Sequence, residues 1–86
     1  MLPFIESQES ENIYIRIFSP DIPENELKWH WDEEDRIIEP ISETDWFFQF
    51  DNQLPTAINK PIFIPKGVIH RVIKGTGEMK LKITKM

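Results

Sequence analysis

Cysteine is absent from this chain of 86 residues, which excludes both disulfide bonds and thiolate metal ligands. Positive charge is also scarce, because 10 lysines and arginines face 15 acidic residues and leave a formal net charge of −5. Nucleic-acid-binding domains present a basic patch on a basic domain, so this balance argues against a nucleic-acid partner. The length gives room for one domain, residues 1–86.

Long hydrophobic runs are missing as well. No stretch approaches the roughly 20 apolar residues that a membrane-spanning helix needs. The first ten residues, MLPFIESQES, lack the basic region with which a signal peptide begins. We therefore expect a cytoplasmic protein without a membrane partner, and the absence of cysteine agrees with this location.

Helical periodicity is nearly absent, and an alternation of apolar and polar residues with period two takes its place. Four stretches show it: NIYIRIFS, ELKWHWD, WFFQFD and EMKLKIT. β-branched and aromatic residues dominate these stretches, as is typical of a half-buried sheet. The pattern places the three isoleucines of NIYIRIFS on one strand face and points Met79, Leu81 and Ile83 into a core.

Turn residues separate the predicted strands. Most of the seven prolines stand at the boundaries of the alternating stretches, where strands start and stop. The sequence KGTG, between HRVI and EMKLKI, predicts a short hairpin connection that contains glycine. Many short strands with turns at this spacing predict an all-β sandwich or barrel.

The stretch KWHWDEEDR, residues 28–36, allows two interpretations. In the first, an antiparallel strand buries its two tryptophans while His30 and Asp32 face water. In the second, the strand is turned over, so that His30 and Asp32 project from the inner face and can ligate one metal ion. We expect Glu34 and Asp35 to be solvated turn residues.

The stretch IFIPKGVIHRV, residues 62–72, carries the most regular strand–turn–strand signal of the chain. Pro65 cannot donate to a sheet ladder and Gly67 readily takes a positive φ, so the chain turns there. After the turn, His70 shares a strand face with two valines. A histidine in this position is either a core residue satisfied by a backbone carbonyl or water, or part of a polar site.

The residues PKGVIH resemble the second conserved motif of the cupin superfamily, in which a turn carries a histidine into a small barrel. Asn59 and Lys74 stand where that motif has its first glycine and its last asparagine, so both ends depart from it. The resemblance covers residues 27–84. It implies an all-β, RmlC-like jelly-roll barrel with its core over 27–86, preceded by an amino-terminal strand and connection over 1–26.

The first cupin motif, with two histidines, a glutamate and a glycine at fixed spacing, is degenerate in this chain. One alignment sets His30 and Asp32 on the two histidines, with Arg36 on the glutamate. In that alignment Glu43 takes the place of the glycine. A shift by two residues instead sets Lys28 and His30 on the two histidines and Glu34 on the glutamate, but it fits the following strand less well.

The resemblance implies a divalent metal, commonly iron, manganese, zinc or nickel in cupins, held by His30, Asp32 and His70. Arg36 cannot ligate a metal, because its guanidinium stays protonated. It either pairs with Asp32 in place of a metal or binds an anionic ligand. The convergence of polar groups in an apolar barrel mouth is a candidate ligand site.

These residues agree with three functions. The leading one is a small metal-binding cupin that holds a small polar ligand in the barrel mouth. The second is a metal-free ligand-binding or structural dimer module, in which Asp32 and Arg36 pair. The third is a small metal-dependent enzyme, either an iron oxygenase or an isomerase with His70 as base, although the chain has no lid-length loop.

If His30 and Asp32 face inward, then Leu27, Trp29 and Trp31 face outward. Two exposed tryptophans would form an apolar patch of a kind that monomers seldom tolerate. Either the amino-terminal strand or a second copy of the chain could cover that patch. We expect a homodimer, in which the amino-terminal strand could be exchanged between subunits.

Overall fold

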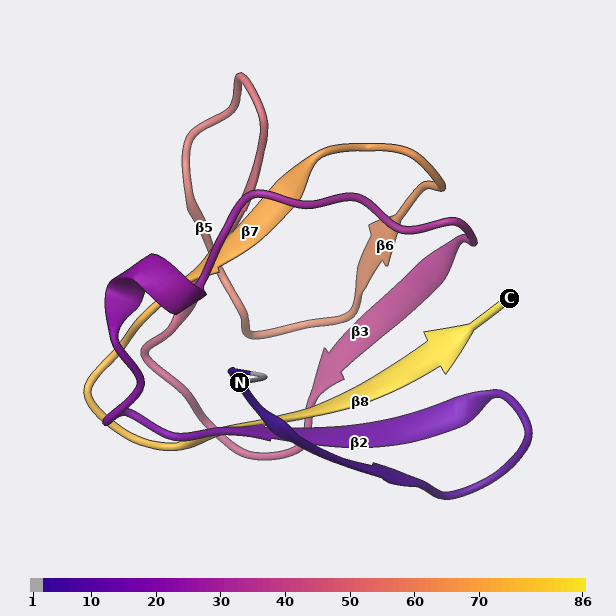
Figure 1. Ribbon diagram of the computed structural model, residues 1–86, viewed down its shortest axis with the longest axis horizontal. Coiled ribbons are helices and arrows are strands. Elements are labelled where there is room, and N and C mark those ends of the chain that lie inside the picture. Colours follow the sequence, from indigo (N-terminus) through magenta and orange to yellow (C-terminus); the bar gives the residue numbers. More distant parts are fainter. Residues whose placement is uncertain (1–2) are drawn as a thin grey trace.

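The computed structural model describes residues 3–86 and forms two antiparallel sheets (Figure 1). The strands are β1 (Ile5–Gln8), β2 (Ile13–Phe18), β3 (Arg36–Pro40), β4 (Phe47–Phe50), β5 (Thr56–Ala57), β6 (Ile62–Ile64), β7 (His70–Ile73) and β8 (Met79–Lys85), and a short 3₁₀ helix, η1 (Glu24–Glu26), follows β2. The larger sheet has the order β1-β2-β8-β3-β6 and the smaller one β5-β4-β7. The predicted all-β class is confirmed.

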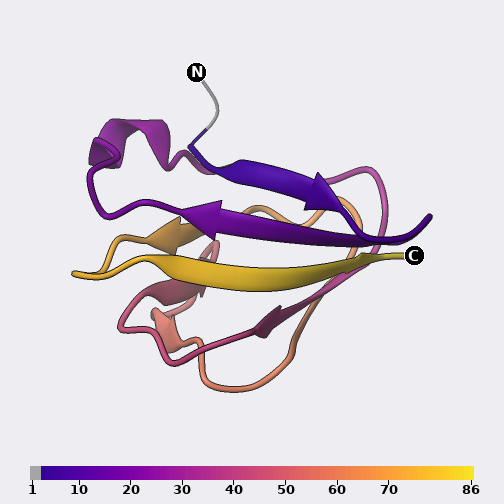
Figure 2. The same ribbon diagram turned by 90° about the horizontal axis from the view of Figure 1, so that it is seen from below.

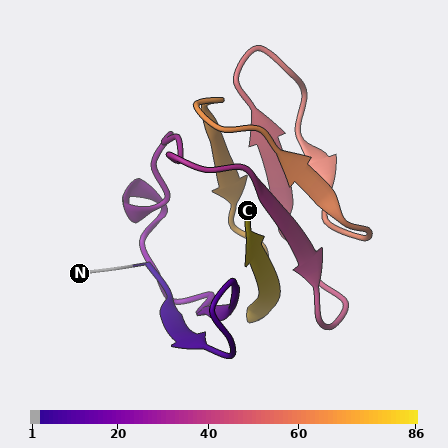
Figure 3. The same ribbon diagram turned by 90° about the vertical axis from the view of Figure 1, so that its right-hand side faces the viewer.

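The two sheets share one hydrophobic core. In Figure 3 the strands β4 and β7 lie on the opposite side of the molecule from the β1–β2 hairpin. The buried apolar side chains come from both sheets and from the loops between them: Phe18, Ile38, Trp46, Phe48, Ile58, Ile64, Met79, Leu81 and Ile83. Among the described residues, no helix is long and apolar enough to cross a membrane.

Strand β8 lies at the centre of the larger sheet, between β2 and β3 (Figure 2). Its alternation is as predicted, since Met79, Leu81 and Ile83 are buried in the core. Strand β2 pairs with β8 of the same chain, with Phe18 opposite Met79. Phe18 is therefore on the inner face, and the three isoleucines of β2 lie on the outer face of the sheet.

The predicted hairpin at KGTG is wrong. Strand β7 pairs with β4 in the smaller sheet, whereas β8 pairs with β2 and β3 in the larger sheet. The connection over residues 74–78 therefore crosses from one sheet to the other. The carboxylate of Asp45 holds it, by accepting hydrogen bonds from the backbone N–H and the hydroxyl of Thr76.

The crossing connection leaves no room for a side chain at Gly75. A Cβ atom there would lie 2.7 Å from Cδ1 of Trp46 and 2.8 Å from the carbonyl carbon of Asp45. We expect Gly75→Ala to lower the free energy of unfolding by about 1–3 kcal/mol, because overpacking forces neighbouring atoms apart. Thermal denaturation should show a midpoint lower by at least about 4 °C.

The matched control for this prediction is Gly77→Ala. A Cβ atom at Gly77 meets no atom within 4 Å, and its carbonyl can still accept the hydrogen bond from the Trp46 indole. If the thermal midpoint of Gly75→Ala is as high as that of Gly77→Ala, the connection accommodates the added methyl group without loss of stability, and the prediction is wrong.

Asp45 also makes the stability of the connection depend on pH. Its hydrogen bonds from the hydroxyl and the backbone N–H of Thr76 lower the pKa of the Asp45 carboxyl below its ordinary value. The contribution of Asp45 is therefore present above about pH 4 and is lost as the pH falls through the folded-state pKa. In acid titrations followed by circular dichroism, Asp45→Asn should lose less stability than the wild type below pH 4. Equal losses in both proteins would contradict this assignment.

Candidate metal and ligand site

Three polar side chains, those of His30, Asp32 and His70, meet at one end of the core. His70 begins β7, where it lies opposite Phe50 of β4. On its other side it forms an isolated bridge with His30, and each backbone N–H of the pair donates to the other residue's carbonyl at 3.0 and 2.9 Å. The predicted strand over ELKWHWD is therefore wrong, because only this one bridge forms there.

The glycine turn fixes the position of Asp32. Gly67 has a φ of +79°, as predicted, so the chain reverses between β6 and β7. The N–H of Gly67 donates a hydrogen bond of 2.9 Å to the carbonyl of Asp32. The turn that delivers His70 thus also anchors the segment that carries Asp32.

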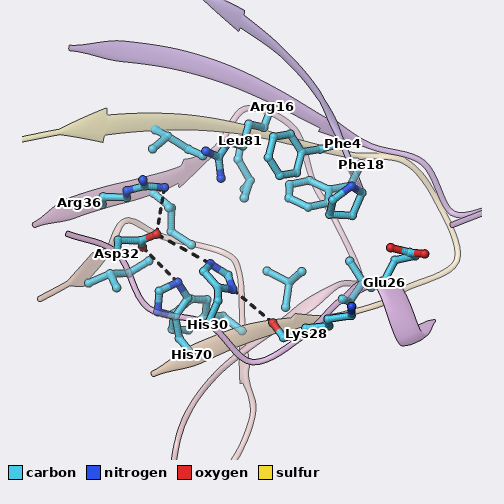
Figure 4. Close-up of a pocket in the computed structure, with 17 residues that line it drawn as sticks. Phe4, Arg16, Phe18, Glu26, Lys28, His30, Asp32, Arg36, His70 and Leu81 are labelled. Atoms are coloured by element: carbon cyan, nitrogen blue, oxygen red, sulfur yellow. Dashed lines mark hydrogen bonds and ion pairs between the residues drawn. The ribbon is translucent and has the colours of Figure 1, made fainter. Parts of the chain in front are cut away.

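The three side chains point toward one another (Figure 4). Oδ1 of Asp32 lies 3.9 Å from Nε2 of His30, and Oδ2 lies 3.4 Å from Nε2 of His70. One ligand atom from each residue can be chosen so that all lie within 4.8 Å of one another. On a tetrahedral zinc ion, ligand atoms about 2.0–2.2 Å from the metal lie about 3.4 Å apart. Oδ2 of Asp32 and Nε2 of His70 already have this separation, and the most distant pair of ligand atoms would need to approach by up to about 1.4 Å.

Both imidazoles have the orientation that a metal ligand requires. Nδ1 of His30 lies 3.2 Å from the carbonyl oxygen of Lys28, and Nδ1 of His70 lies 2.9 Å from that of Val68. A carbonyl oxygen only accepts, so each Nδ1 carries the hydrogen and donates it. In the neutral imidazole, Nε2 then presents a lone pair toward Asp32, and the hydrogen bond from Nδ1 is of the kind that orients histidine ligands in metal sites.

The burial of these groups differs. His70 is 4% exposed and the side chain of Asp32 is 8% exposed, whereas the side chain of His30 is 51% exposed. Burial lowers the pKa of His70 below its ordinary value, which favours the neutral imidazole that binds metals. The site is therefore closed on the side of His70 and accessible on the side of His30.

One oxygen of the Asp32 carboxylate lacks a hydrogen-bond donor among the described residues. Among residues 3–86, no group donates a hydrogen bond to its buried Oδ2. The distance of 3.4 Å to Nε2 of His70 is longer than the roughly 2.7–2.9 Å of a charge-assisted hydrogen bond. The Nε2 atoms of the two histidines thus converge on a carboxylate whose Oδ2 no described residue satisfies. A divalent cation would satisfy all three, so the residues fit the metal that the cupin resemblance implies.

Arg36 lies beside this group, as predicted. Its Nη1 is 3.4 Å from Oδ1 of Asp32, and its side chain is 12% exposed. Its Nη2 is 3.2 Å from Oε1 of Glu34, so the expectation that Glu34 is a solvated acid is wrong. Asp35 is exposed, but its carboxylate accepts a hydrogen bond from the N–H of Lys66 and so anchors the PKG turn.

The polar group opens into a cavity of about 350 Å³ between the two sheets (Figure 4). Most of its wall is apolar: Pro3, Phe4, Phe18, Leu27, Ile38, Phe48, Ile64, Val72, Leu81 and Ile83. Arg16, Glu26, Lys28 and Arg36 line it together with the three site residues. The sequence pattern predicts neither Arg16 nor Leu27 at the site. Arg16 stands two residues before Phe18 and therefore shares its face of β2, which is the pattern that could have predicted Arg16 at the site.

The two tryptophans face outward, as in the interpretation of KWHWDEEDR that turns His30 and Asp32 toward the inner face. Trp29 is 42% exposed and Trp31 is 57% exposed. The guanidinium of Arg71 lies 4.3 Å from the ring centre of Trp29, and the amino-terminal strand leaves both indoles uncovered. Leu27, expected beside them, instead packs against the core. The homodimer stays a prediction.

Comparisons with known proteins agree with this fold. No protein-family model matches the sequence, and no curated protein matches it. Among solved structures, a cupin domain from Bordetella pertussis matches with a TM-score of 0.64 at 16% identity, over 99% of this chain and 95% of that domain. DMSP lyase DddQ from Ruegeria pomeroyi matches with a TM-score of 0.74 at 13% identity, over 96% of this chain and 46% of that protein.

A third match is the structure of Fe(II) HppE, with a TM-score of 0.64 at 17% identity, over 86% of this chain and 41% of that one. The chain spans less than half of the lyase and of HppE, so each of these two matches covers only a part of the larger protein. The match to the Bordetella domain extends over nearly the whole of both chains. This chain therefore has the fold of the cupin domain from Bordetella pertussis, and its PKGVIH turn carries His70 into the core.

Proposed function

We propose that this protein binds a divalent metal ion through His30, Asp32 and His70 and holds a small ligand in the adjoining cavity. The buried Oδ2 of Asp32 carries this proposal, because it has no donor among the described residues and faces a lone pair of His70. Unpaired buried acceptors of this kind are costly in a folded protein. The proposal retains a cytoplasmic location, as expected from the sequence.

The metal-free alternative rests on the contact between Arg36 and Asp32. That contact engages only Oδ1, at 3.4 Å, and Arg36 also contacts Glu34. The ion pair therefore leaves Oδ2 and both Nε2 lone pairs without a partner. For this reason we favour a metal over an ion pair as the group that completes the site.

A metal-dependent enzyme is the second candidate. Two proteins of similar fold support it, one a lyase and the other determined in an Fe(II) form. The metal would supply a Lewis acid or redox centre, while the residues of this chain would position it and bind the substrate. The cavity between the sheets offers room for a small substrate beside that centre.

The metal proposal is tested by metal analysis of protein purified without an affinity tag, followed by calorimetric titration with zinc. We expect one zinc ion per chain. His30→Gln and His70→Gln should each weaken zinc binding by at least about 100-fold, because even residues that only support ligands contribute 10- to 100-fold.

Glu33→Gln is the matched control, since Glu33 is exposed and lies next to Asp32 in the sequence. It should keep the zinc affinity of the wild type. His30 is the more informative of the two histidines, because its side chain is half exposed and its replacement should not unfold the protein. Unchanged zinc affinity in folded His30→Gln would overturn the proposal.

A further inference from the structure

The cavity beside the candidate metal site carries a charge balance that depends on the metal. Three cationic side chains line it, and four carboxylates line it or pair with those cations: Arg16, Lys28 and Arg36 against Glu6, Glu26, Asp32 and Glu34. With both histidines neutral, these seven side chains together have a net charge of −1. A divalent ion changes this to +1, which a ligand with a single negative charge would neutralise.

Arg36, which lines the cavity, has one donor without an acceptor. Nε of Arg36 is buried and makes no hydrogen bond with any residue of the described range 3–86. The Nη atoms of the same guanidinium already contact Asp32 and Glu34. A buried donor without an acceptor is unfavourable, and an anionic oxygen from a ligand would satisfy it by a charge-assisted hydrogen bond.

The rest of the cavity favours a hydrocarbon. Phe18, Phe48 and Leu81 belong to its wall and are buried in the core. Clefts that bind small molecules are mostly apolar, with a few polar groups that fix the ligand's orientation. Here His70, Asp32 and Arg36 form one polar end of the cavity, while Glu26 lies on the opposite side (Figure 4).

From these features we propose that the ligand is a monocarboxylate with an apolar body, and that it binds to the metal-loaded protein. This inference rests on the proposed metal site. The carboxylate accepts a hydrogen bond from Arg36 beside the metal, and the apolar body lies between the two sheets. Because coupling between two ligands is reciprocal, the carboxylate should strengthen metal binding by the same factor as the metal strengthens carboxylate binding.

The test uses hexanoate as the probe, titrated by calorimetry into zinc-loaded and into metal-free protein. We expect the zinc-loaded form to bind hexanoate about 5- to 150-fold more tightly, the usual range of such coupling. Acetate lacks the apolar body, hexan-1-ol lacks the charge, and hexylammonium has the opposite charge. Each of these should bind the zinc-loaded protein at least about tenfold more weakly, since burial of methylene groups and neutralisation of charge both contribute.

Arg36→Gln separates the role of the arginine from that of the metal. It should bind zinc at least as tightly as the wild type, because a cation that contacts Asp32 is removed, and it should lose most of the preference for hexanoate over hexan-1-ol. Arg71→Gln is the control, because Arg71 is not among the residues that line the cavity and lies over Trp29. It should bind hexanoate as the wild type does.

The outcomes distinguish the two proposals. If the wild type does not bind zinc, the proposed metal function fails. If zinc binds but hexanoate binds no better than hexan-1-ol or acetate, the metal function stands and the ligand class is wrong. Equal affinity of hexanoate for the zinc-loaded and metal-free forms would also overturn the ligand inference.

Discussion

Asp32→Asn is expected to weaken zinc binding by at least about 100-fold and, at the same time, to stabilise the metal-free protein. The amide removes the anionic ligand between two imidazoles. Its nitrogen can donate a hydrogen bond to Nε2 of His70, which now faces the unpaired Oδ2 of Asp32 at 3.4 Å. One new hydrogen bond contributes about 1 kcal/mol, or about 4–8 °C in the thermal midpoint of a domain this small.

Opposite changes in metal affinity and stability would identify Asp32 as a residue kept for binding rather than for folding. Zinc titration and thermal denaturation in a chelator measure the two effects on the same protein. Glu33→Gln should change neither. If Asp32→Asn instead lowers the midpoint of the metal-free protein, then Asp32 serves mainly as the ion-pair partner of Arg36. That result would favour the metal-free interpretation.

The double variant Trp29→Ser, Trp31→Ser is expected to convert a homodimer into a monomer. Trp29 stacks on Arg71, which the strand register places opposite Gln49 on the outer face of the smaller sheet. Phe47 lies on the same face and is 41% exposed. Aromatic residues at the centre of an interface usually provide most of the association energy. Sedimentation at high micromolar concentration should show a dimer for the wild type.

Phe63→Ser provides the control for this experiment. Phe63 is 51% exposed and belongs to β6 of the larger sheet, so its loss removes a comparable aromatic surface elsewhere. This variant should remain dimeric, and circular dichroism should show that the double variant is folded. A wild-type protein that sediments as a monomer would refute the dimer.

Local patterns were enough to predict the direction of many side chains. Period-two alternation fixes which residues share a strand face, and so it correctly placed Met79, Leu81 and Ile83 in the core. A glycine after a proline predicted the turn at Gly67, which has the expected positive φ. The same turn carried the resemblance to cupins, and the structural comparisons agree with that fold.

Strand partners could not be predicted in the same way. The hairpin expected at KGTG was wrong, because short sequence separation favours pairing but does not impose it. Strand β7 instead pairs with β4, and β8 is enclosed between β2 and β3. The choice of strand partners depends on how the two sheets pack against each other to bury Trp46 and Phe48. No local sequence pattern specifies that packing.

The amino-acid sequence by itself determined the all-β class, the turn at Gly67 and the types of residue able to form a polar site. Only the tertiary structure decided that His30 and His70, 40 positions apart, bond to each other and aim their Nε2 atoms at Asp32. It also decided that the tryptophans face outward and that Arg16 lines the cavity. The physical reason is that alternation defines two faces of a strand, whereas burial against the other sheet selects which face is inside.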